Sequence, residues 1–503
     1  MKKFDKQFAS EILQYALWFG IVTGLVEGVF LYAMQRYELL RGQITYLGSG
    51  PQVLWVAPVF DALFFLLAGV GVAVVAQFLP QKLAKQAVFF VFCFLAFFAW
   101  LLIYLSGRLN PAATAILGAG IGYQISTVIF ARENRFASFA QRTFKIFAGV
   151  TLALFVLIQG GFWIQERVAT SNLPQANEST PNVLVIVMDT VRADHLSLQG
   201  YERETDPTLK RIASEGVMFE NAYAASSWTL TSHASLFTGR WPYEHKADGG
   251  RYLDETYPTI AEALTQRGYR AGAFNGNFET VTSHWGFGRG FLHFEDYYQT
   301  LPQLAVSSVY GRFIEYYVLH KVFNMEFSID RRWGPSVNRS ALDWIEQDDS
   351  KPFFAFVNYY DAHAPYISPE RAKFSNLPNP GGLVNTDWTT ADIYNPKTPE
   401  QVQGEIDAYD GGIDYTDQQI DALLKELESR GKLDNTIVVI TSDHGELFGE
   451  HGLWEHHNSL YKPVIHVPLI VWYPQSVPQA VRISTPVSNT FVPAMLLDML
   501  GEP

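Results

Sequence analysis

The chain has 503 residues, enough for two or three domains, and its formal net charge of −13 is unevenly distributed. Residues 1–165 hold 12 Lys and Arg against 6 Asp and Glu, whereas the remainder holds 25 against 44. The acidic second part argues against a nucleic-acid partner, because phosphate backbones are bound by clustered positive charge. The single cysteine, Cys93, lies in an apolar run and excludes an intrachain disulfide.

The first third of the sequence contains five apolar stretches of about 20 residues, the length that crosses a hydrocarbon core of ~30 Å. They predict a five-helix transmembrane domain over residues 1–165, with helices at 13–34, 53–79, 87–106, 111–131 and 144–165. Nine Lys and Arg share a side with the N-terminus, and three fall on the opposite side. The positive-inside rule therefore predicts an integral membrane protein (inner membrane in a bacterium) with a cytoplasmic N-terminus. The odd number of crossings places the rest of the chain outside the cytoplasm.

Two features of the sequence leave alternatives open. Glu27 and Asp61 fall inside predicted crossings, where an ionised group is costly unless it is paired or faces water. They indicate either a polar site in the bundle, for example for a lipid head group, or protonated carboxyls beside a neighbour. Residues 296–345 mix aromatic and basic side chains without strand alternation. This stretch is either an insertion at the membrane interface or a helical insertion packed on the domain.

The second part of the chain has the pattern of a layered α/β domain. Residues 166–181 are polar, with prolines at 174 and 181, and predict a linker to a domain over 182–503. The run NVLVIVM is typical of a strand buried on both faces of a parallel sheet. The predicted strands lie at 182–188, 352–360, 435–442 and 466–473, and helical patterns lie between them at 259–269 and 417–431. This alternation predicts a mostly parallel central sheet.

Side chains that suit a divalent metal follow three of these strands. Asp189 follows the first strand, Asp361 and His363 follow the second, and Asp443 and His444 follow the third. Ligands of open α/β sheets bind at the carboxyl ends of the strands, where these side chains meet. A cation would also offset the repulsion between buried carboxylates. Each residue alone is equally typical of a helix cap or a surface charge, but their joint occurrence predicts a metal site.

The segment TLTSHASLFTG predicts a helix whose first turn contains Thr229. A helix N-terminus favours an anion, and metal coordination can turn a hydroxyl into a nucleophile. The alternative is that Thr229 or Ser227 is only an N-cap.

Four segments together resemble the alkaline phosphatase/sulfatase superfamily: NVLVIVMDTVRADHLSLQGY, TLTSHASLFTG, DNTIVVITSDHGELFGEHG and IHVPLIVWYP. The resemblance implies an alkaline-phosphatase-like (sulfatase) fold and places Thr229 at the position of the nucleophile. Sulfatases have there a Cys or Ser that becomes formylglycine, an aldehyde that threonine cannot form. Thr190 also stands where sulfatases usually have a further metal-binding Asp. The ligands that remain are similar to the single-metal site of phosphoethanolamine transferases and lipoteichoic acid synthases, which share this layout of crossings, linker and extracytoplasmic domain.

The same resemblance implies the roles of the site residues. The implied metal ligands are Asp189, Thr229, Asp443 and His444. The implied catalytic residues are Thr229 as nucleophile with His363 and His456, and the further substrate-binding candidates are His233, His451, His457 and Asn277. The implied cofactor is one divalent metal ion, Zn²⁺ or Mn²⁺, with Ca²⁺ or Mg²⁺ as the alternatives.

The implied function is transfer of a phospho-substituent from a phosphodiester lipid donor, through a phospho-threonine intermediate, to a lipid or glycan acceptor. One alternative is a sulfatase-like hydrolase of sulfate or phosphate esters, which ASLFTG and YDGGIDYTDQQIDALL favour. A second is a catalytically degenerate domain that only binds a ligand. The expected partners are therefore a membrane lipid and a lipid or glycan substrate, with no nucleic acid.

Overall fold

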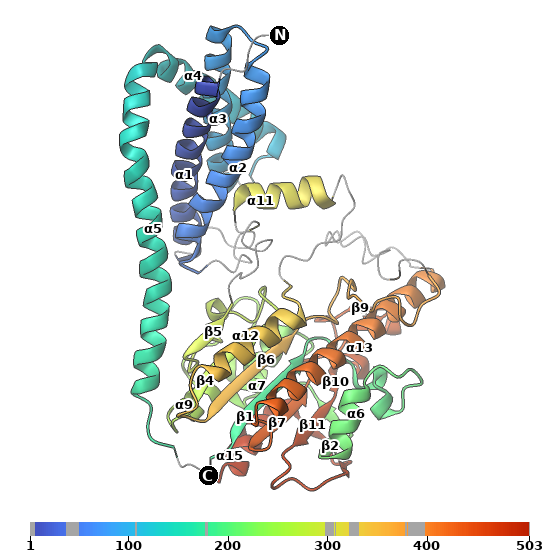
Figure 1. Cartoon of the computed structure of the whole chain (residues 1–503). Helices are drawn as coiled ribbons and strands as arrows, with labels where there is room; N and C mark the ends of the chain where they lie inside the picture. Colours follow the sequence, from blue (N-terminus) through green and yellow to red (C-terminus); the bar gives the residue numbers. More distant parts are fainter. Residues whose placement is uncertain are drawn as a thin grey trace. The chain divides into compact units, whose positions relative to one another are not determined.

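The computed structural model describes residues 6–36, 50–105, 108–176, 180–296, 308–320, 331–377 and 398–501, together with Val306 and Pro380. The chain divides into two compact units. The first holds Met1–Gln165 and Tyr297–Ile329, and the second holds Glu166–Asp296 and Asp330–Pro503. The first unit is helical and the second is an α/β unit, as the sequence predicts (Figure 1).

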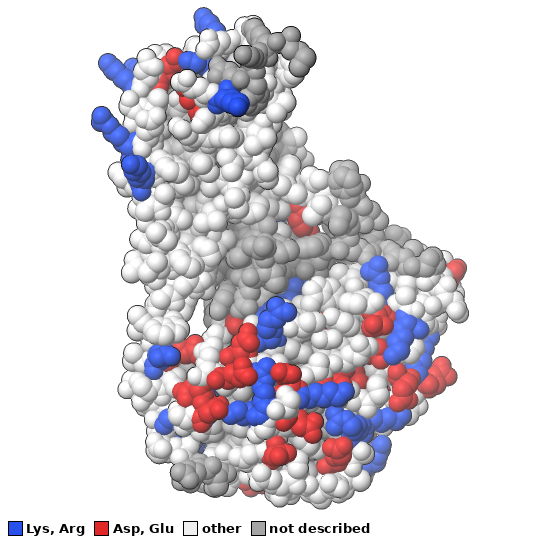
Figure 2. Space-filling view, in the orientation of Figure 1, with Lys and Arg blue, Asp and Glu red and all other residues white. Residues whose placement is uncertain are grey.

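Five long apolar helices form the first unit, and each is long and apolar enough to cross a membrane. They are α1 (Lys6–Arg36), α2 (Val53–Ala76), α3 (Gln81–Tyr104), α4 (Pro111–Ala131) and α5 (Glu133–Ser171). Helices α1, α3 and α5 begin before the predicted apolar stretches, because their first turns are polar. Helix α5 also continues into the first residues of the predicted linker. Figure 2 shows Lys and Arg side chains gathered toward the end of this unit where α1 begins.

Helices α1 and α2 pack in close antiparallel contact through glycine. A Cβ on Gly24 would lie 2.3 Å from the Pro58 Cα, and a Cβ on Gly28 would lie 2.8 Å from the Val53 carbonyl oxygen. Small residues at these positions let two helix backbones approach closely in a membrane. Alanine at either position would therefore separate the two helices.

The segment predicted as an insertion contributes α11 (Val309–Phe313) to the helical unit, where it contacts α3. The first amide of α11 donates to Glu27 Oε1 at 2.9 Å. Asp61 is fully buried in α2, and neither of its oxygens has a hydrogen-bond partner among the described residues. The two carboxyls predicted to lie inside the bundle are thus both buried there, and Glu27 has a backbone donor. Much of the remaining insertion lies outside the described residues.

The second unit is built on an eight-stranded sheet in the order β12-β2-β11-β7-β1-β6-β4-β5. Strands β7, β1, β6, β4 and β5 are parallel, and β11 runs against both its neighbours. The sheet is therefore mostly parallel, as predicted. The strand bounds are β1 (Asn182–Met188), β2 (Val217–Phe219), β4 (Arg270–Asn275), β5 (His293–Glu295), β6 (Phe353–Tyr359), β7 (Thr436–Thr441), β11 (Leu469–Trp472) and β12 (Val481–Ile483).

The strand predicted at 466–473 is divided in the structure. Its first residues form β10 (His466–Val467), which joins β3 (Ala222–Tyr223) in a separate small sheet, and its last residues form β11. Pro468 lies between the two and cannot donate a ladder hydrogen bond, so the pairing breaks at this residue.

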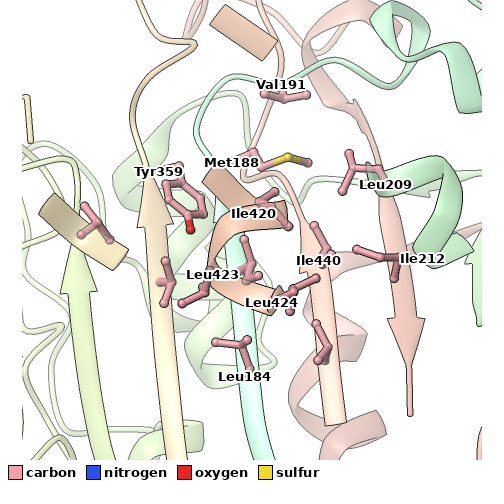
Figure 3. Close-up of a cluster of buried hydrophobic side chains, with 14 of the residues drawn as sticks. Leu184, Met188, Val191, Leu209, Ile212, Tyr359, Ile420, Leu423, Leu424 and Ile440 are labelled. Atoms are coloured by element: carbon pink, nitrogen blue, oxygen red, sulfur yellow. The ribbon is translucent and has the colours of Figure 1, made fainter. Parts of the chain in front are cut away.

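Helices cover both faces of the large sheet. The even-numbered residues of β1 pack in one core and the odd-numbered residues pack in another, as expected when successive side chains alternate. Figure 3 shows the first core, in which Leu184 and Met188 of β1 share a cluster with Leu423, Leu424 and Ile440. The covering helices are α12 (Gly334–Glu346) and α13 (Pro399–Ser429) on that face, and α7 (Thr229–Thr238), α9 (Ile260–Thr265) and α15 (Val492–Met499) on the other. Because both faces are apolar, polar side chains gather at the strand ends.

Candidate functional site

Three segments bring the predicted metal ligands together at the carboxyl ends of the central strands. Asp189 directly follows β1, and Asp443 and His444 follow β7. One ligand atom from each residue lies within 4.8 Å of the others, and all three side chains are fully buried. The adjacent parallel strands β1 and β7 thus deliver two carboxylates and an imidazole to one point.

Each carboxylate in this group has one oxygen that accepts hydrogen bonds and one that accepts none from the described residues. Asp443 Oδ1 accepts the backbone N–H groups of Thr190 at 3.2 Å and His444 at 2.9 Å. Asp189 Oδ2 accepts the Asn277 amide at 3.0 Å. Asp443 Oδ2 and Asp189 Oδ1 are buried without a hydrogen-bond partner among the described residues. Buried polar atoms are normally satisfied, so two orphaned anionic oxygens beside an imidazole fit a bound cation.

The electrostatics of the group also favour a cation. Burial raises the pKa of Asp443 to about 7, against the backbone N–H groups that lower it. Burial and the nearby charge of Asp443 raise the pKa of Asp189 well above its ordinary value. Burial lowers the pKa of His444 to about 4, which keeps this imidazole neutral at pH 7. Two carboxylates so placed cannot both ionise at low cost without a compensating positive charge.

Thr229 is the first residue of α7, and its hydroxyl belongs to the same group. The His444 Nδ1–H donates to the Gly445 carbonyl at 2.9 Å, so Nε2 carries the lone pair. The Thr229 hydroxyl donates to this Nε2 at 3.0 Å. The N-cap of α7 is Trp228, and no side chain caps the helix. The structure therefore assigns neither Thr229 nor Ser227 the role of a simple N-cap.

The turn after β1 has a strained backbone at Thr190, the residue whose N–H binds Asp443. Thr190 has φ +63°, a left-handed conformation that a β-branched residue rarely adopts. Its N–H points to Asp443 Oδ1, and its carbonyl accepts the Tyr409 hydroxyl at 2.7 Å. Such strain of about 1–3 kcal/mol persists only where neighbouring contacts enforce it, and it is common at functional sites.

Two predicted catalytic histidines lie beside the metal group. His363 follows β6, its Nδ1–H donates to the next carbonyl at 2.6 Å, and its ring stacks on Tyr360 with centroids 4.2 Å apart. The His456 Nδ1–H donates to Glu446 Oε1 at 2.9 Å. The His456 ring lies 4.5 Å from the His444 ring and 5.1 Å from the His363 ring. In both catalytic candidates Nδ1 is engaged, so Nε2 is the atom that can exchange a proton.

The other predicted substrate-binding residues lie at different depths. The His233 Nδ1–H donates to the Thr229 carbonyl at 2.9 Å, and its fully buried ring packs among phenylalanines on the core side of α7. The exposed His457 ring lies 4.7 Å from the His456 ring. His451 stacks on Tyr461 at the surface, with centroids 3.7 Å apart. His457 is thus beside the site, and His451 contacts a surface ring. His233 lies beneath the site, with its Nδ1 3.5 Å from Asp443 Oδ2.

Two buried residues hold predicted site residues in ways that the sequence did not indicate. Asn277, predicted as a substrate contact, holds Asp189 instead of facing solvent, and its Oδ1 accepts two backbone N–H groups. Glu446, absent from the prediction, is fully buried and holds His456. It stands two residues after the predicted metal ligand His444.

A separate, partly buried ion cluster joins the last turns of α5 to the edge strand β5. His293 Nδ1 lies 3.0 Å from Glu166 Oε2, and its Nε2 lies 3.0 Å from Glu295 Oε1. Burial lowers the pKa of His293, but the two carboxylates outweigh it and raise that pKa to about 9. This imidazole is therefore charged at pH 7.

Comparisons with known proteins agree with the geometry. The sequence model of the sulfatase family matches residues 181–502. An arylsulfatase of Clostridium perfringens is 27% identical over 343 residues, covering 58% of this chain and 69% of that protein. An N-acetylglucosamine-6-O-sulfatase of Bacteroides thetaiotaomicron is 25% identical over 406 residues, covering 65% of this chain and 69% of that protein. The chain thus spans about two thirds of the length of these curated relatives.

Among solved structures, the phosphonate monoester hydrolase of Agrobacterium radiobacter has the same fold. It superposes with a TM-score of 0.51 at 21% sequence identity, covering 64% of this chain and 74% of that chain.

Proposed function

Because this chain belongs to the sulfatase family and is an enzyme of that superfamily, we propose that it acts on phosphorus. In the proposed reaction it transfers a phospho-substituent from a phosphodiester lipid to a hydroxyl of a lipid or glycan, through a covalent intermediate on Thr229. One observation carries the proposal. The Thr229 hydroxyl donates to Nε2 of His444, a predicted metal ligand, 3.0 Å away and beside two orphaned carboxylate oxygens.

Asp189, Asp443 and His444 are the residues that would hold the cation. When bound, it would lower the pKa of the Thr229 hydroxyl and offset charge on the phosphoryl oxygens. Two carboxylates, one imidazole and one hydroxyl form a small mixed donor set that suits Zn²⁺ or Mn²⁺. Ca²⁺ takes six to eight oxygen ligands and Mg²⁺ keeps several waters, so they are the less fitting alternatives.

The chain's own residues account for the two half-reactions. In the first, Thr229 Oγ loses its proton to an imidazole and forms a bond to phosphorus, the bond from phosphorus to the leaving oxygen breaks, and that oxygen receives a proton. In the second, an acceptor hydroxyl loses its proton and attacks phosphorus, the bond from phosphorus to Thr229 Oγ breaks, and Oγ regains a proton. The first-turn amides of α7 face the anion that develops at this helix end.

His456 and His363 are placed to move these protons. Burial lowers the pKa of His456 to about 3 and that of His363 well below its ordinary value, so both are neutral before substrate binds. An entering phosphoryl anion would raise both pKa values, because opposite charge favours the imidazolium. Nε2 of either ring then gives its proton to the leaving oxygen and later accepts one from the attacking hydroxyl. In His363 this nitrogen also lies 3.4 Å from the Tyr360 hydroxyl.

A hydrolase of phosphate or sulfate esters is the second candidate, favoured by the names of the curated relatives. It would use the same nucleophile with water as the acceptor. Threonine cannot become the formylglycine that sulfatases use, and this favours phosphorus over sulfur for Thr229.

The test is a mass measurement on the full-length protein. Loaded with Zn²⁺ or Mn²⁺, it is incubated with a phosphodiester lipid, an aryl phosphate and an aryl sulfate in separate arms. We expect the phospho-substituent on the peptide that contains Thr229, and no adduct in Thr229→Ala. Thr238→Ala, a like change at the other end of α7, should keep the adduct. Sulfate release by the unchanged enzyme would favour the hydrolase, and full turnover by Thr229→Ala would overturn both candidates.

We also propose that the helices anchor the enzyme in a membrane, with the N-terminus cytoplasmic and the α/β unit on the other side. The support is the charge bias of the helix ends and the odd number of crossings. The test uses a Cys93→Ala background with a single new cysteine at Lys82 or at Thr485, labelled with an impermeant thiol reagent. Only the cysteine at Thr485 should react in intact cells, and reaction at Lys82 alone would reverse the proposed orientation.

A further inference from the structure

The helical unit contains a cavity of about 940 Å³ between α1, α3 and α5. Much of its wall is aromatic or aliphatic. The cavity also carries charged groups from all three helices: Glu11, Lys85, Glu133, Arg142 and Lys145. An aromatic cavity with charges resembles a site for an amphipathic ligand more than a gap in an apolar core.

Helix α5 is barely packed against the rest of the unit. Only Ala140 and Thr151 are buried among its described side chains. The contacts that tie its first half to the other helices include the Trp18 indole, which donates to the Thr143 hydroxyl at 2.8 Å. The exposed apolar side chains of α5 require apolar groups packed against them, because an empty space beside the helix would lose their dispersion contacts.

The charges of the cavity favour an anion at one place. Lys85 and Glu133 neutralise each other at 3.0 Å. Arg142 and Lys145 are exposed, and neither has an ion pair in the part of the chain that the structure describes. Glu11 is the one remaining acid of the lining, which leaves the cavity with net positive charge. Basic pockets between transmembrane helices are typical binding sites of anionic lipid head groups.

A second cavity in the same unit differs from the first because it has no charged side chains among the described residues of its lining. It measures about 430 Å³, lies between α2 and α3, and is lined by apolar side chains throughout. Such a groove can accommodate only acyl chains. The larger cavity differs because it offers a guanidinium and an ammonium next to aromatic walls.

We propose that the larger cavity binds one anionic glycerophospholipid of the surrounding bilayer. Arg142 and Lys145 contact its phosphate, and its acyl chains fill the space between α1 and α5 along Tyr15, Trp18 and Phe144. The bound lipid completes the packing of α5 against the bundle. This inference rests on the helices spanning a bilayer, and it does not depend on which ester the α/β unit cleaves.

The test is lipid retention by the full-length protein, reconstituted in nanodiscs of phosphatidylcholine with a minority of phosphatidylglycerol. The protein is then released into mild detergent, and bound lipid is identified by native mass spectrometry. We expect about one phosphatidylglycerol per chain. The double variant Arg142→Gln/Lys145→Gln should bind it about 30-fold more weakly, since each basic side chain contributes about 1 kcal/mol.

The matched control is Arg132→Gln/Arg135→Gln, which removes equal charge near the same helix ends but outside the cavity lining. A second variant, Ala137→Trp, fills the cavity without changing charge and should also exclude the lipid. A photoreactive phosphatidylglycerol should label residues 6–18 and 133–145. Equal loss in both double variants, equal retention of phosphatidylcholine, or a dimer in place of the lipid would each overturn the proposal.

Discussion

Replacing Asp443 by Asn should change metal binding and the stability of the metal-free protein in opposite directions. The Asn oxygen can still accept the N–H groups of Thr190 and His444, which now bind Asp443 Oδ1. The orphaned Oδ2 becomes an amide nitrogen, which cannot ligate a cation as a carboxylate does. The charge that repels Asp189 disappears at the same time.

The magnitude follows from the pKa of Asp443, which burial raises from 3.8 to about 7. Below pH 3.8 the carboxyl is protonated in both the folded and unfolded states, and its burial costs nothing extra. Between pH 3.8 and 7 the unfolded state loses this proton while the folded state keeps it, so the cost to stability grows over this range and reaches at most about 4 kcal/mol above pH 7. Coupling to Asp189 and local relaxation reduce this to about 2 kcal/mol, which corresponds to roughly 3 °C in Tm for a unit of this size. Loss of a ligand should weaken metal affinity by more than about 100-fold.

The assay is thermal unfolding of the full-length protein in detergent at pH 5 and pH 8, with chelator or with added Zn²⁺. With chelator, Asp443→Asn should melt higher than the unchanged protein at pH 8 and by a smaller margin at pH 5. Added metal should raise Tm of the unchanged protein but not of the variant.

Asp361→Asn is the matched control for this experiment. Asp361 is fully buried at the end of β6, its Oδ1 accepts the Gly334 N–H at 3.0 Å, and burial raises its pKa to about 6. It lies outside the ligand group. Asp361→Asn should therefore stabilise the metal-free protein and leave metal affinity unchanged. If Asp443→Asn binds metal as well as this control does, the assignment of Asp443 as a ligand is refuted.

Three further predictions concern the proposed nucleophile Thr229, the proposed positioning residue Glu446 and the ion cluster around His293. Thr229→Ala should lower kcat by at least about 10³-fold, whereas Thr229→Ser should retain part of the activity. Equal rates for the two variants would contradict the assignment of Thr229 as the nucleophile. Glu446→Gln should lower kcat about tenfold with little change in KM, and should shift the acid limb of the pH–rate profile, because it loosens His456. His293 has a folded pKa of about 9, above its ordinary 6.5, so its stabilisation is complete below pH 6.5 and lost as the pH rises through 9. Tm of the unchanged protein should thus fall between pH 7 and 10, and His293→Gln should show a flatter curve in the same melts.

The sequence predicted the part of the site that follows from chain order alone. Asp189 directly follows one apolar run, and Asp443 and His444 come shortly after the end of another. A run buried on both faces delivers the polar residues that follow it to the sheet edge. This placement at the sheet edge does not depend on which strands are neighbours. The helix that begins at Thr229 was similarly visible, because Gly239 adopts the left-handed conformation that ends it.

What the sequence could not predict depends on strand order in space. Asn277 comes from the loop after β4, and β6 lies between β4 and β1. The hydrogen bond from Asn277 to Asp189 therefore requires the order β1-β6-β4, which chain order does not determine. Likewise Glu446 reaches His456 only because the chain turns back through β8 (Leu447–Phe448) and β9 (Trp454–Glu455).

The lone pair on His444 Nε2 would link metal binding to the protonation of the Thr229 hydroxyl, the proposed nucleophile. In the neutral ring that nitrogen has a single acceptor position, and in this structure the Thr229 hydroxyl fills it. His444 is one of the residues that would hold the cation, and a cation bound at Nε2 would compete with the Thr229 hydroxyl for that position. The Thr229 oxygen lies at the first turn of α7 near the neutral rings of His363 and His456, which could receive its proton. Burial raises the pKa of both carboxyls of the metal-free group, and the opposed shifts expected for Asp443→Asn follow from the same burial.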